Sequence, residues 1–274
     1  MISCRRIYGT AFAVLFQSGG RTMDIAIVTG ASSGLGSEFA RRLDEEGLDE
    51  IWVSARRRER LESLAAHLKT SARIVDGDVT DVTFIDRLRS ILKKGISVRY
   101  LINAAGYGRI GGAIDIDAMD EAGMIDVNCK ALLLITRAVL PYMHSGARIG
   151  MLCSAAAFQP IPYIGTYAAT KAFVLSYSRS LGEELRQQGI YVTAICPYWV
   201  KDTEFVSTAK KYTDGFIKRL PFANHKTYVV SKALNDMKHG RSVSTPGLMA
   251  TIDRYGSAVL PTGLIMRLSR LLMG

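Results

Sequence analysis

A tyrosine and a lysine four positions apart, Tyr167 and Lys171, have the residue types and spacing of a proton-transfer pair. On a helix, side chains four residues apart share one face. A nearby ammonium favours the phenolate, so we expect Lys171 to lower the pKa of Tyr167 from its usual value of about 10 towards working pH. Tyr167 would then give a proton to a reacting oxygen or take one from it. The plain alternative is a surface Tyr–Lys pair without a catalytic role.

Ser154 precedes Tyr167 by thirteen residues and follows the stretch 148–153, which has the apolar pattern of a strand. Parallel α/β sheets bind ligands at the carboxyl ends of their strands. We therefore expect the Ser154 hydroxyl to donate a hydrogen bond to the same reacting oxygen. The alternative is an ordinary serine at the end of a strand.

The stretch Asp24–Gly36, DIAIVTGASSGLG, is typical of a strand, a glycine-rich turn and the start of a helix. Glycines let the backbone approach a pyrophosphate, and the free N–H groups of the first helical turn point at it. The glycines Gly30, Gly34 and Gly36 do not have the G-x-G-x-x-G spacing of the standard dinucleotide fingerprint. A plain loop is the alternative, but a position directly after an apolar strand favours an anion site.

Strands and helices alternate along the rest of the chain. Beyond the first strand at 25–28 and its helix, which ends near Gly47, we expect strands at 50–54, 72–75, 98–102, 148–153 and 191–195, an edge strand at 242–244, and helices at 58–69, 81–92, 120–143, within 163–188, and at 227–238. This order predicts an α/β fold with a doubly wound parallel sheet of about seven strands, helices on both faces (Rossmann-like) and a single domain.

The ends of the chain differ from this regular part. Residues 1–22 hold Arg5, Arg6 and an apolar run that is too short to span a bilayer and has no cleavage site after it. Our hypothesis is that Met23 is the true start, and that 1–22 is a non-native or disordered extension. Residues 23–274 would form one dinucleotide-binding domain with a substrate lid at about 198–225 and a C-terminal helical tail. The tail, 264–273, could lie on a membrane surface, but we favour a cover over an apolar patch of this fold or of a partner subunit.

Composition narrows the function classes. The chain has 274 residues, of which 48% are hydrophobic and 22% charged, as in globular proteins. The net charge of +10 could indicate a polyanionic partner, but no basic face is interleaved with aromatics, so we expect no nucleic acid and no stable membrane insertion. The four cysteines and four histidines lack paired or metal-like spacing. We expect no metal, reduced cysteines and a cytoplasmic location.

Motifs along the chain occur together in one known family. They are TGASSGLG at Thr29–Gly36, Asp78-Val79, NAAG at Asn103–Gly106, Asn128, Ser154, YAATK at Tyr167–Lys171, and Pro197. From Met23 to about Ser244 the chain resembles the short-chain dehydrogenase/reductase family, in its compact single-domain branch. A Y-x-x-x-K pair alone would be common by chance, but the ordered set is not.

The resemblance implies roles for particular residues. Ser154, Tyr167, Lys171 and Asn128 would be catalytic, with Lys171 also holding the nicotinamide ribose and Asn128 anchoring a water relay to Lys171. The implied cofactor-binding residues are Gly30, Ser32, Ser33, Gly34, Leu35, Gly36, Arg56, Asp78, Val79, Asn103, Ala104, Gly106, Tyr167, Lys171, Pro197, Val200 and Thr203.

The end of the second strand indicates the choice between NAD and NADP. An acidic side chain there would bind the ribose 2′-hydroxyl of NAD, whereas an arginine accommodates the 2′-phosphate of NADP. This chain has Ala55 at that position, followed by Arg56, Arg57 and Arg58. We predict that Arg56 binds the phosphate and the cofactor is NADP, and that Arg57 and Arg58 only solvate the start of a helix.

One stretch departs from the family pattern. The family usually has a Pro-Gly turn with a threonine five residues after the proline, but this chain reads PYWVKDT, with Tyr198 in place of the glycine. Thr203 comes one position late. This leaves open how the nicotinamide carboxamide is held, with Val200 and Thr203 as candidates.

The expected substrate side is mainly apolar. Ala156, Phe158, Tyr163 and Trp199 would line the mouth of the site, with Tyr107, Phe205 and Phe216 as additions. Their alternative is to pack the core beneath the lid. We expect an NADP-dependent oxidoreductase that acts on a hydrophobic ketone or secondary alcohol, hydroxysteroid-like or 3-oxoacyl-like, and forms a homodimer or homotetramer. The alternatives are a related epimerase or dehydratase, and a catalytically inactive NADP-binding regulator or scaffold.

Overall fold

The computed structural model describes residues 22–213 and 222–273. The hypothesis about the N-terminal extension falls on residues 1–21, outside this part of the chain, and stays a prediction. Phe216 also lies outside the described residues.

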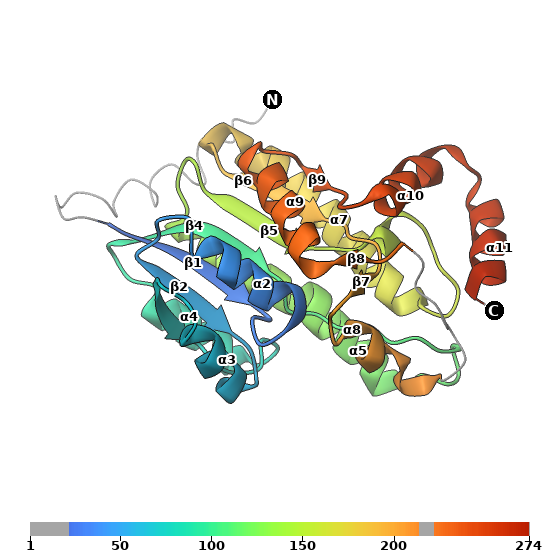
Figure 1. Ribbon diagram of the computed structural model, residues 1–274, viewed down its shortest axis with the longest axis horizontal. Coiled ribbons are helices and arrows are strands. Elements are labelled where there is room, and N and C mark those ends of the chain that lie inside the picture. Colours follow the sequence, from blue (N-terminus) through green and yellow to red (C-terminus); the bar gives the residue numbers. More distant parts are fainter. Residues whose placement is uncertain (1–21, 214–221, 274) are drawn as a thin grey trace, which may run out of the picture.

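A seven-stranded parallel sheet forms the centre of the molecule, in the order β3-β2-β1-β4-β5-β6-β9 (Figure 1). Its strands are β1 (Met23–Thr29), β2 (Glu50–Ser54), β3 (Ser71–Ile74), β4 (Ile96–Asn103), β5 (Arg148–Leu152), β6 (Tyr191–Ile195) and β9 (Val243–Ser244). The order reverses between β1 and β4, which places a ligand crevice at the carboxyl ends of these strands. The predicted fold class and the edge strand at 242–244 are confirmed.

Helices cover both faces of the sheet. The helices of the described residues are α2 (Gly34–Leu43), α3 (Arg58–Ala65), α4 (Val82–Ile91), α5 (Ala118–Ile125), α6 (Leu132–Val139), α7 (Gly165–Leu185), α8 (Phe205–Ala209), α9 (Lys226–Lys238), α10 (Leu248–Val259) and α11 (Thr262–Met273). Buried side chains of α4, α6 and α7 form one apolar cluster with the sheet, and those of α2, α3 and α9 form a second. The site described below therefore rests on a sheet packed from both sides.

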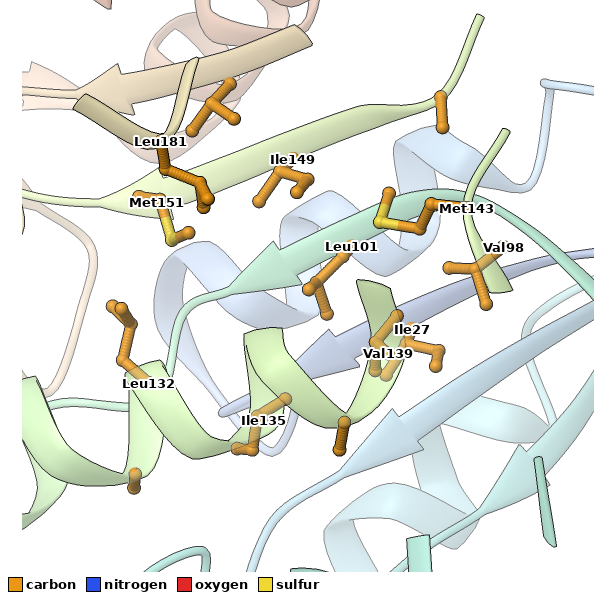
Figure 2. Packing of buried hydrophobic residues seen from close by; sticks show 14 of the residues in the cluster. Ile27, Val98, Leu101, Leu132, Ile135, Val139, Met143, Ile149, Met151 and Leu181 are labelled. Atoms are coloured by element: carbon orange, nitrogen blue, oxygen red, sulfur yellow. The ribbon is translucent and has the colours of Figure 1, made fainter. Parts of the chain in front are cut away.

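The packing on one face follows from the apolar stripe of α6. Figure 2 shows Leu132, Ile135 and Val139 of this helix beside Leu101 of β4 and Ile27 of β1. All five side chains are almost fully removed from solvent. Burial of such side chains contributes roughly 1.5–3 kcal/mol each. This packing therefore holds α6 against β1 and β4, whose carboxyl ends carry the site.

Three expected elements differ from the structure, and one helix was not expected. The predicted helix 120–143 starts at Ala118, where Asp117 caps it, and a π-helical turn, η2 (Asp126–Ala131), interrupts it before α6. The predicted helix 58–69 ends at Ala65. The predicted loop 199–225 contains α8 as its short helix, together with two-residue strands, β7 (Val200–Lys201) and β8 (Asn224–His225), that pair with each other. Helix α10 was not predicted.

No helix among residues 22–213 and 222–273 combines the length and apolar character that crossing a bilayer requires. The predicted C-terminal helix is present as α11. Ile265 of α11 is buried, while Leu264 and Met266 are exposed. Helix α11 therefore covers part of its own fold with one side and leaves an apolar side uncovered.

Candidate active site

The glycine-rich turn connects β1 to α2 and needs glycine at two positions. Gly30 has a φ of +67°, and a Cβ atom on it would lie 2.7 Å from the carbonyl oxygen of Ala104. A Cβ atom on Gly36 would overlap the carbonyl oxygen of Gly30. The turn is therefore as tight as the predicted anion site requires, because any side chain at these positions would push the backbone apart.

The first turn of α2 has no side-chain cap. Ser33 occupies the N-cap position, but its hydroxyl makes no hydrogen bond to the backbone of the helix. The hydroxyl oxygens of Ser32 and Ser33 instead accept hydrogen bonds from Arg57 at 3.1 and 3.0 Å. The first N–H groups of α2 thus lack a side-chain acceptor, and a phosphate could take that place.

Thr29 at the end of β1 fixes the adjacent loop. Its Oγ1 accepts hydrogen bonds from the backbone N–H groups of Ala104 and Ala105, both at 3.1 Å. Asn103, the first residue of the NAAG motif, is buried and donates from Nδ2 to Thr136 Oγ1 at 3.0 Å. Asn103 therefore supports the loop from behind, whereas Ala104 faces the cavity.

Arg56 and Arg57 lie on the cavity wall after β2, but their surroundings differ. The Arg56 side chain is 79% exposed, and its nearest carboxylate oxygen belongs to Asp78, at 3.7 Å. Arg57 bonds both serines of the turn and donates a 2.9 Å hydrogen bond to Glu204. The prediction that Arg57 only solvates a helix start is wrong, because its guanidinium folds back onto the glycine-rich turn.

Arg58, by contrast, behaves as predicted for a solvated helix start. It pairs with Glu62 one turn later and with Asp76. It does not line the cavity. The three consecutive arginines therefore divide into two that line the cavity and one that faces the surface.

Ser154, Tyr167 and Lys171 come together from two elements on the wall of one cavity. Ser154 follows β5, where its Oγ accepts a hydrogen bond from the Ala156 backbone and interacts with the Tyr167 hydroxyl. Tyr167 and Lys171 share a face of α7, with Lys171 Nζ 5.6 Å from the centre of the Tyr167 ring. The ammonium group also donates a 2.8 Å hydrogen bond to the carbonyl oxygen of Leu152. This arrangement places two proton donors and a cation at the carboxyl end of β5.

The structure does not show the expected lowering of the Tyr167 pKa by Lys171. Burial raises the pKa of Tyr167 above its usual value, although the hydrogen bond with Ser154 acts in the opposite direction. Burial also lowers the pKa of Lys171. The prediction that the ammonium lowers the phenol pKa is therefore wrong for the protein without cofactor, because desolvation of the charged form dominates.

Asn128 lies in the π-helical turn η2 and is buried. Its Oδ1 accepts a 3.0 Å hydrogen bond from the Tyr107 backbone N–H, and its Nδ2 donates to the Tyr107 carbonyl at 2.9 Å and to Thr170 Oγ1 at 3.0 Å. A Cβ atom on Gly106 would lie 2.8 Å from Asn128 Oδ1 and 3.5 Å from Lys171 Nζ. Asn128 thus reaches the same spot as Lys171 but lies behind the cavity wall.

The cavity has a volume of about 1240 Å³ and runs from the glycine-rich turn to the C-terminal helices. All of the predicted cofactor residues except Asn103 line it. Of the predicted substrate residues, Ala156 and Trp199 line it, and so do Tyr107 and Phe205.

Two predicted substrate residues do not reach the wall. Phe158 packs against the core cluster of α4, α6 and α7, because the short helix η4 (Ala155–Phe158) turns its side chain towards the sheet. Tyr163 has a φ of +67°, and its carbonyl accepts a hydrogen bond from Gly111 away from the cavity.

Several site residues were missed by the sequence reasoning. Thr29 supports the NAAG loop, Glu204 pairs with Arg57, and Asp253 of α10 lines the cavity. Thr29 was named as the first residue of the TGASSGLG motif, but no role was assigned to it. Glu204 and Asp253 carry no local signal, because only the tertiary fold brings them to the site.

Comparison with known proteins identifies the family. A model of the short chain dehydrogenase family matches residues 24–213. A sulfoacetaldehyde reductase 2 from Chromohalobacter salexigens is 37% identical over 192 residues, which are 66% of this chain and 74% of that protein. The chain belongs to the short chain dehydrogenase family, and its fold, site motifs and relatives are those of oxidoreductases.

Solved structures show the same architecture. A short-chain dehydrogenase from Sphingobium yanoikuyae in complex with NADPH superimposes with a TM-score of 0.73 at 29% identity, covering 89% of this chain and 95% of that chain. A bulky-bulky ketone specific alcohol dehydrogenase from Comamonas testosteroni has a TM-score of 0.70 at 26% identity, covering 86% and 92% of the two chains.

Proposed function

We propose that the protein is an NADP(H)-dependent oxidoreductase that interconverts a hydrophobic ketone and the corresponding secondary alcohol. The observation that carries this proposal is a single cavity lined by the glycine-rich turn, by Ser154, Tyr167 and Lys171, and by an apolar wall. A binding site for a dinucleotide and a proton donor for a carbonyl are thus continuous, as hydride transfer requires.

The residues present fit a bound dinucleotide phosphate. Gly30 and Gly36 allow close approach of the backbone, and the uncapped start of α2 offers its N–H groups to a pyrophosphate. Arg56 and Arg57 would hold the 2′-phosphate, and Lys171 the nicotinamide ribose. Thr203 lies directly beside Gly34, since a Cβ atom on Gly34 would be 3.6 Å from the Thr203 side chain. Val200 and Thr203 remain the candidates for the carboxamide.

The cofactor supplies the hydride, and the residues of the chain position and protonate the carbonyl. Tyr167 gives its phenolic proton to the carbonyl oxygen in reduction and takes it back in oxidation. Ser154 donates a second hydrogen bond to that oxygen and stabilises its developing negative charge. Lys171 places a positive charge beside the phenol, and Asn128 fixes the loop at Tyr107 and anchors a proton relay.

The cavity wall favours an uncharged, apolar substrate. Beyond the cofactor side the described wall includes Trp199, Phe205, Met249, Ile252 and Leu260. Its basic residues in the described part of the chain are Arg56, Arg57 and Lys171, all on the cofactor side. A small anion such as a sulfonate would therefore lack a partner, whereas a bulky ketone would fill the space.

A spectrophotometric panel tests the proposal. Purified protein with NADPH would be offered a 3-oxosteroid, a 3-oxoacyl thioester, 4-phenylbutan-2-one and sulfoacetaldehyde, with absorbance followed at 340 nm and Tyr167→Phe as control. We expect turnover of at least one hydrophobic ketone. Exclusive turnover of sulfoacetaldehyde would overturn the substrate class. Tight NADPH binding without any turnover would favour a scaffold, and conversion without net NADPH consumption an epimerase or dehydratase.

We also propose that the protein is cytoplasmic and forms a homodimer or homotetramer. Met119 and Ile125 on α5 and Phe173 on α7 are exposed large apolar side chains on packed helices, which supports a subunit interface there. Light scattering at micromolar concentration would measure the assembly, and a monomer would contradict it.

A further inference from the structure

Asp253 is a cavity-lining carboxylate that the proposed mechanism does not use. It lies on α10, and α10 packs against the short helix η4 that directly follows Ser154. The acid therefore lines the cavity from a helix that packs near Ser154, whereas Tyr167 lines it from α7. Its neighbours in that wall are Met249, Ile252 and Gly256.

The Asp253 carboxylate has no hydrogen-bond or ion-pair partner among residues 22–213 and 222–273. The adjacent Arg254 does not pair with it, and its guanidinium lies 5.4 Å from the centre of the Tyr255 ring instead. Burial raises the pKa of the nearby Tyr198, and the negative charge of Asp253 raises it further. Burial raises the pKa of Asp253 itself to about 6, so the group is largely ionised at neutral pH.

An ionised carboxylate can only accept hydrogen bonds. Holding one in partly buried, apolar surroundings without a donor destabilises the protein. A ligand that brings an N–H or O–H group to this point would relieve that cost, whereas a ligand with a second carbonyl or an acid group would not. Asp253 would thus favour hydrophobic ketones that carry a hydrogen-bond donor on their apolar part over those that do not.

We propose that Asp253 is a specificity-determining residue, which accepts a hydrogen bond from a hydroxyl or a protonated amine on the apolar body of the substrate. This inference rests on the proposed function, because it takes the ketone to be held between Tyr167 and α10. It narrows the substrate class to hydrophobic ketones with a donor group away from the carbonyl.

Matched substrates test the inference. The probes are 4-phenylbutan-2-one and its para-hydroxymethyl and para-aminomethyl derivatives, compared by kcat/KM with wild type, Asp253→Asn and Asp253→Leu. We expect wild type to favour at least one donor-bearing ketone over the parent by roughly ten- to a hundredfold, the range for a hydrogen bond to a charged group. Asp253→Leu should abolish this preference, which is a ratio of two kcat/KM values and is read independently of how the variant changes kcat/KM for the parent ketone.

The isosteric Asp253→Asn keeps an acceptor without the charge, so it should lose the preference for the amine more than that for the alcohol. Asp86→Asn removes an exposed carboxylate from α4 and serves as the charge control, with no expected change. If wild type turned over both derivatives with the same kcat/KM as the parent ketone, the inference would be overturned. An undiminished preference in Asp253→Leu would do the same.

Calorimetry separates this inference from the proposed function. If no ketone is turned over, 4-phenylbutylamine and 4-phenylbutan-1-ol would be titrated into cofactor-free wild type and Asp253→Leu. Binding that is at least tenfold weaker in the variant would support the donor site even though the redox function had failed. Equal binding to the two proteins, or no binding to wild type, would overturn it.

Discussion

Glu204 accepts a 2.9 Å hydrogen bond from Arg57, and this contact joins the segment after β7 to the arginine beside the glycine-rich turn. The same carboxylate pairs with Arg60. The hydrogen bonds from Arg60 and Arg57 lower the pKa of Glu204. If NADP binds as proposed, its 2′-phosphate would compete with Glu204 for the Arg57 guanidinium.

Replacing Glu204 with glutamine should therefore strengthen NADP binding. The pair is about half exposed, and exposed ion pairs contribute roughly 0.2–1 kcal/mol, so the dissociation constant should fall up to about fivefold. NAD lacks the phosphate and should bind as before. Fluorescence titration of both cofactors measures this, with Glu62→Gln as the control for loss of a neighbouring surface carboxylate. Weaker NADP binding in Glu204→Gln would mean that Glu204 positions Arg57 instead of competing for it.

Removing Arg56 should weaken NADP binding by roughly ten- to a hundredfold, the value of one charge-assisted hydrogen bond or two. NAD binding should change little. Arg58→Ala is a matched control, because Arg58 pairs with Glu62 and Asp76 and does not line the cavity. Arg57→Ala should also weaken NADP, since its guanidinium faces the same turn.

The double variant Ala55→Asp with Arg56→Ala should prefer NAD outright. The new carboxylate would repel the 2′-phosphate and accept a hydrogen bond from the ribose 2′-hydroxyl of NAD. Calorimetric titration of both cofactors into wild type and this variant measures the switch. Equal affinity of wild type for NAD and NADP would contradict the assignment of Arg56.

Tyr167→Phe should lower turnover by roughly two to four orders of magnitude, the range for loss of a general acid or base. NADPH binding should be nearly unchanged, because the ring and Lys171 remain in place. Ser154→Ala should cost about a hundredfold, as for a lost oxyanion donor. Single-turnover kinetics with a hydrophobic ketone measure both, and most of the activity persisting in Tyr167→Phe would remove Tyr167 from this role.

Much of this site follows from local patterns in the sequence. Apolar runs and helical spacing predict the strands, the helices and the doubly wound parallel sheet, and the positions of Ser154, Tyr167 and Lys171 on the strand end and helix follow from them. Gly30 and Gly36 were predictable because only glycine permits their close backbone contacts. These features depend on residues that are close together in the sequence, so local sequence patterns are enough to predict them.

The remainder depends on distant contacts. The hydrogen bond from Arg57 to Ser32 joins residues 25 positions apart, and its pairing with Glu204 joins residues 147 positions apart. The raised pKa of Tyr167 depends on how completely the folded chain desolvates the phenol. The π-helical turn at Asn128 arises where the side chain bonds Tyr107 and Thr170, neither of which a helical pattern would reveal.

The raised pKa of Tyr167 predicts opposite pH dependences for the two directions of the reaction. Burial keeps the phenol protonated beyond its usual pKa of about 10. Ketone reduction needs the protonated phenol, so its kcat/KM should stay level from pH 6 to 9. Alcohol oxidation needs the phenolate, whose population grows tenfold per pH unit below the pKa, so its kcat/KM should rise throughout this range.

The measurement is kcat/KM in both directions at saturating cofactor. Using 4-phenylbutan-2-one and its alcohol, which lack a donor on the ring, keeps the titration of Asp253 near pH 6 out of the profile. In Tyr167→Phe, the residual kcat/KM for alcohol oxidation should not rise with pH. This result would show that the rise in wild type comes from the Tyr167 phenol. A fall in ketone reduction between pH 6 and 8 would mean that the phenol pKa in the complex lies near neutrality. The charge of Lys171 would then outweigh desolvation once the cofactor is bound.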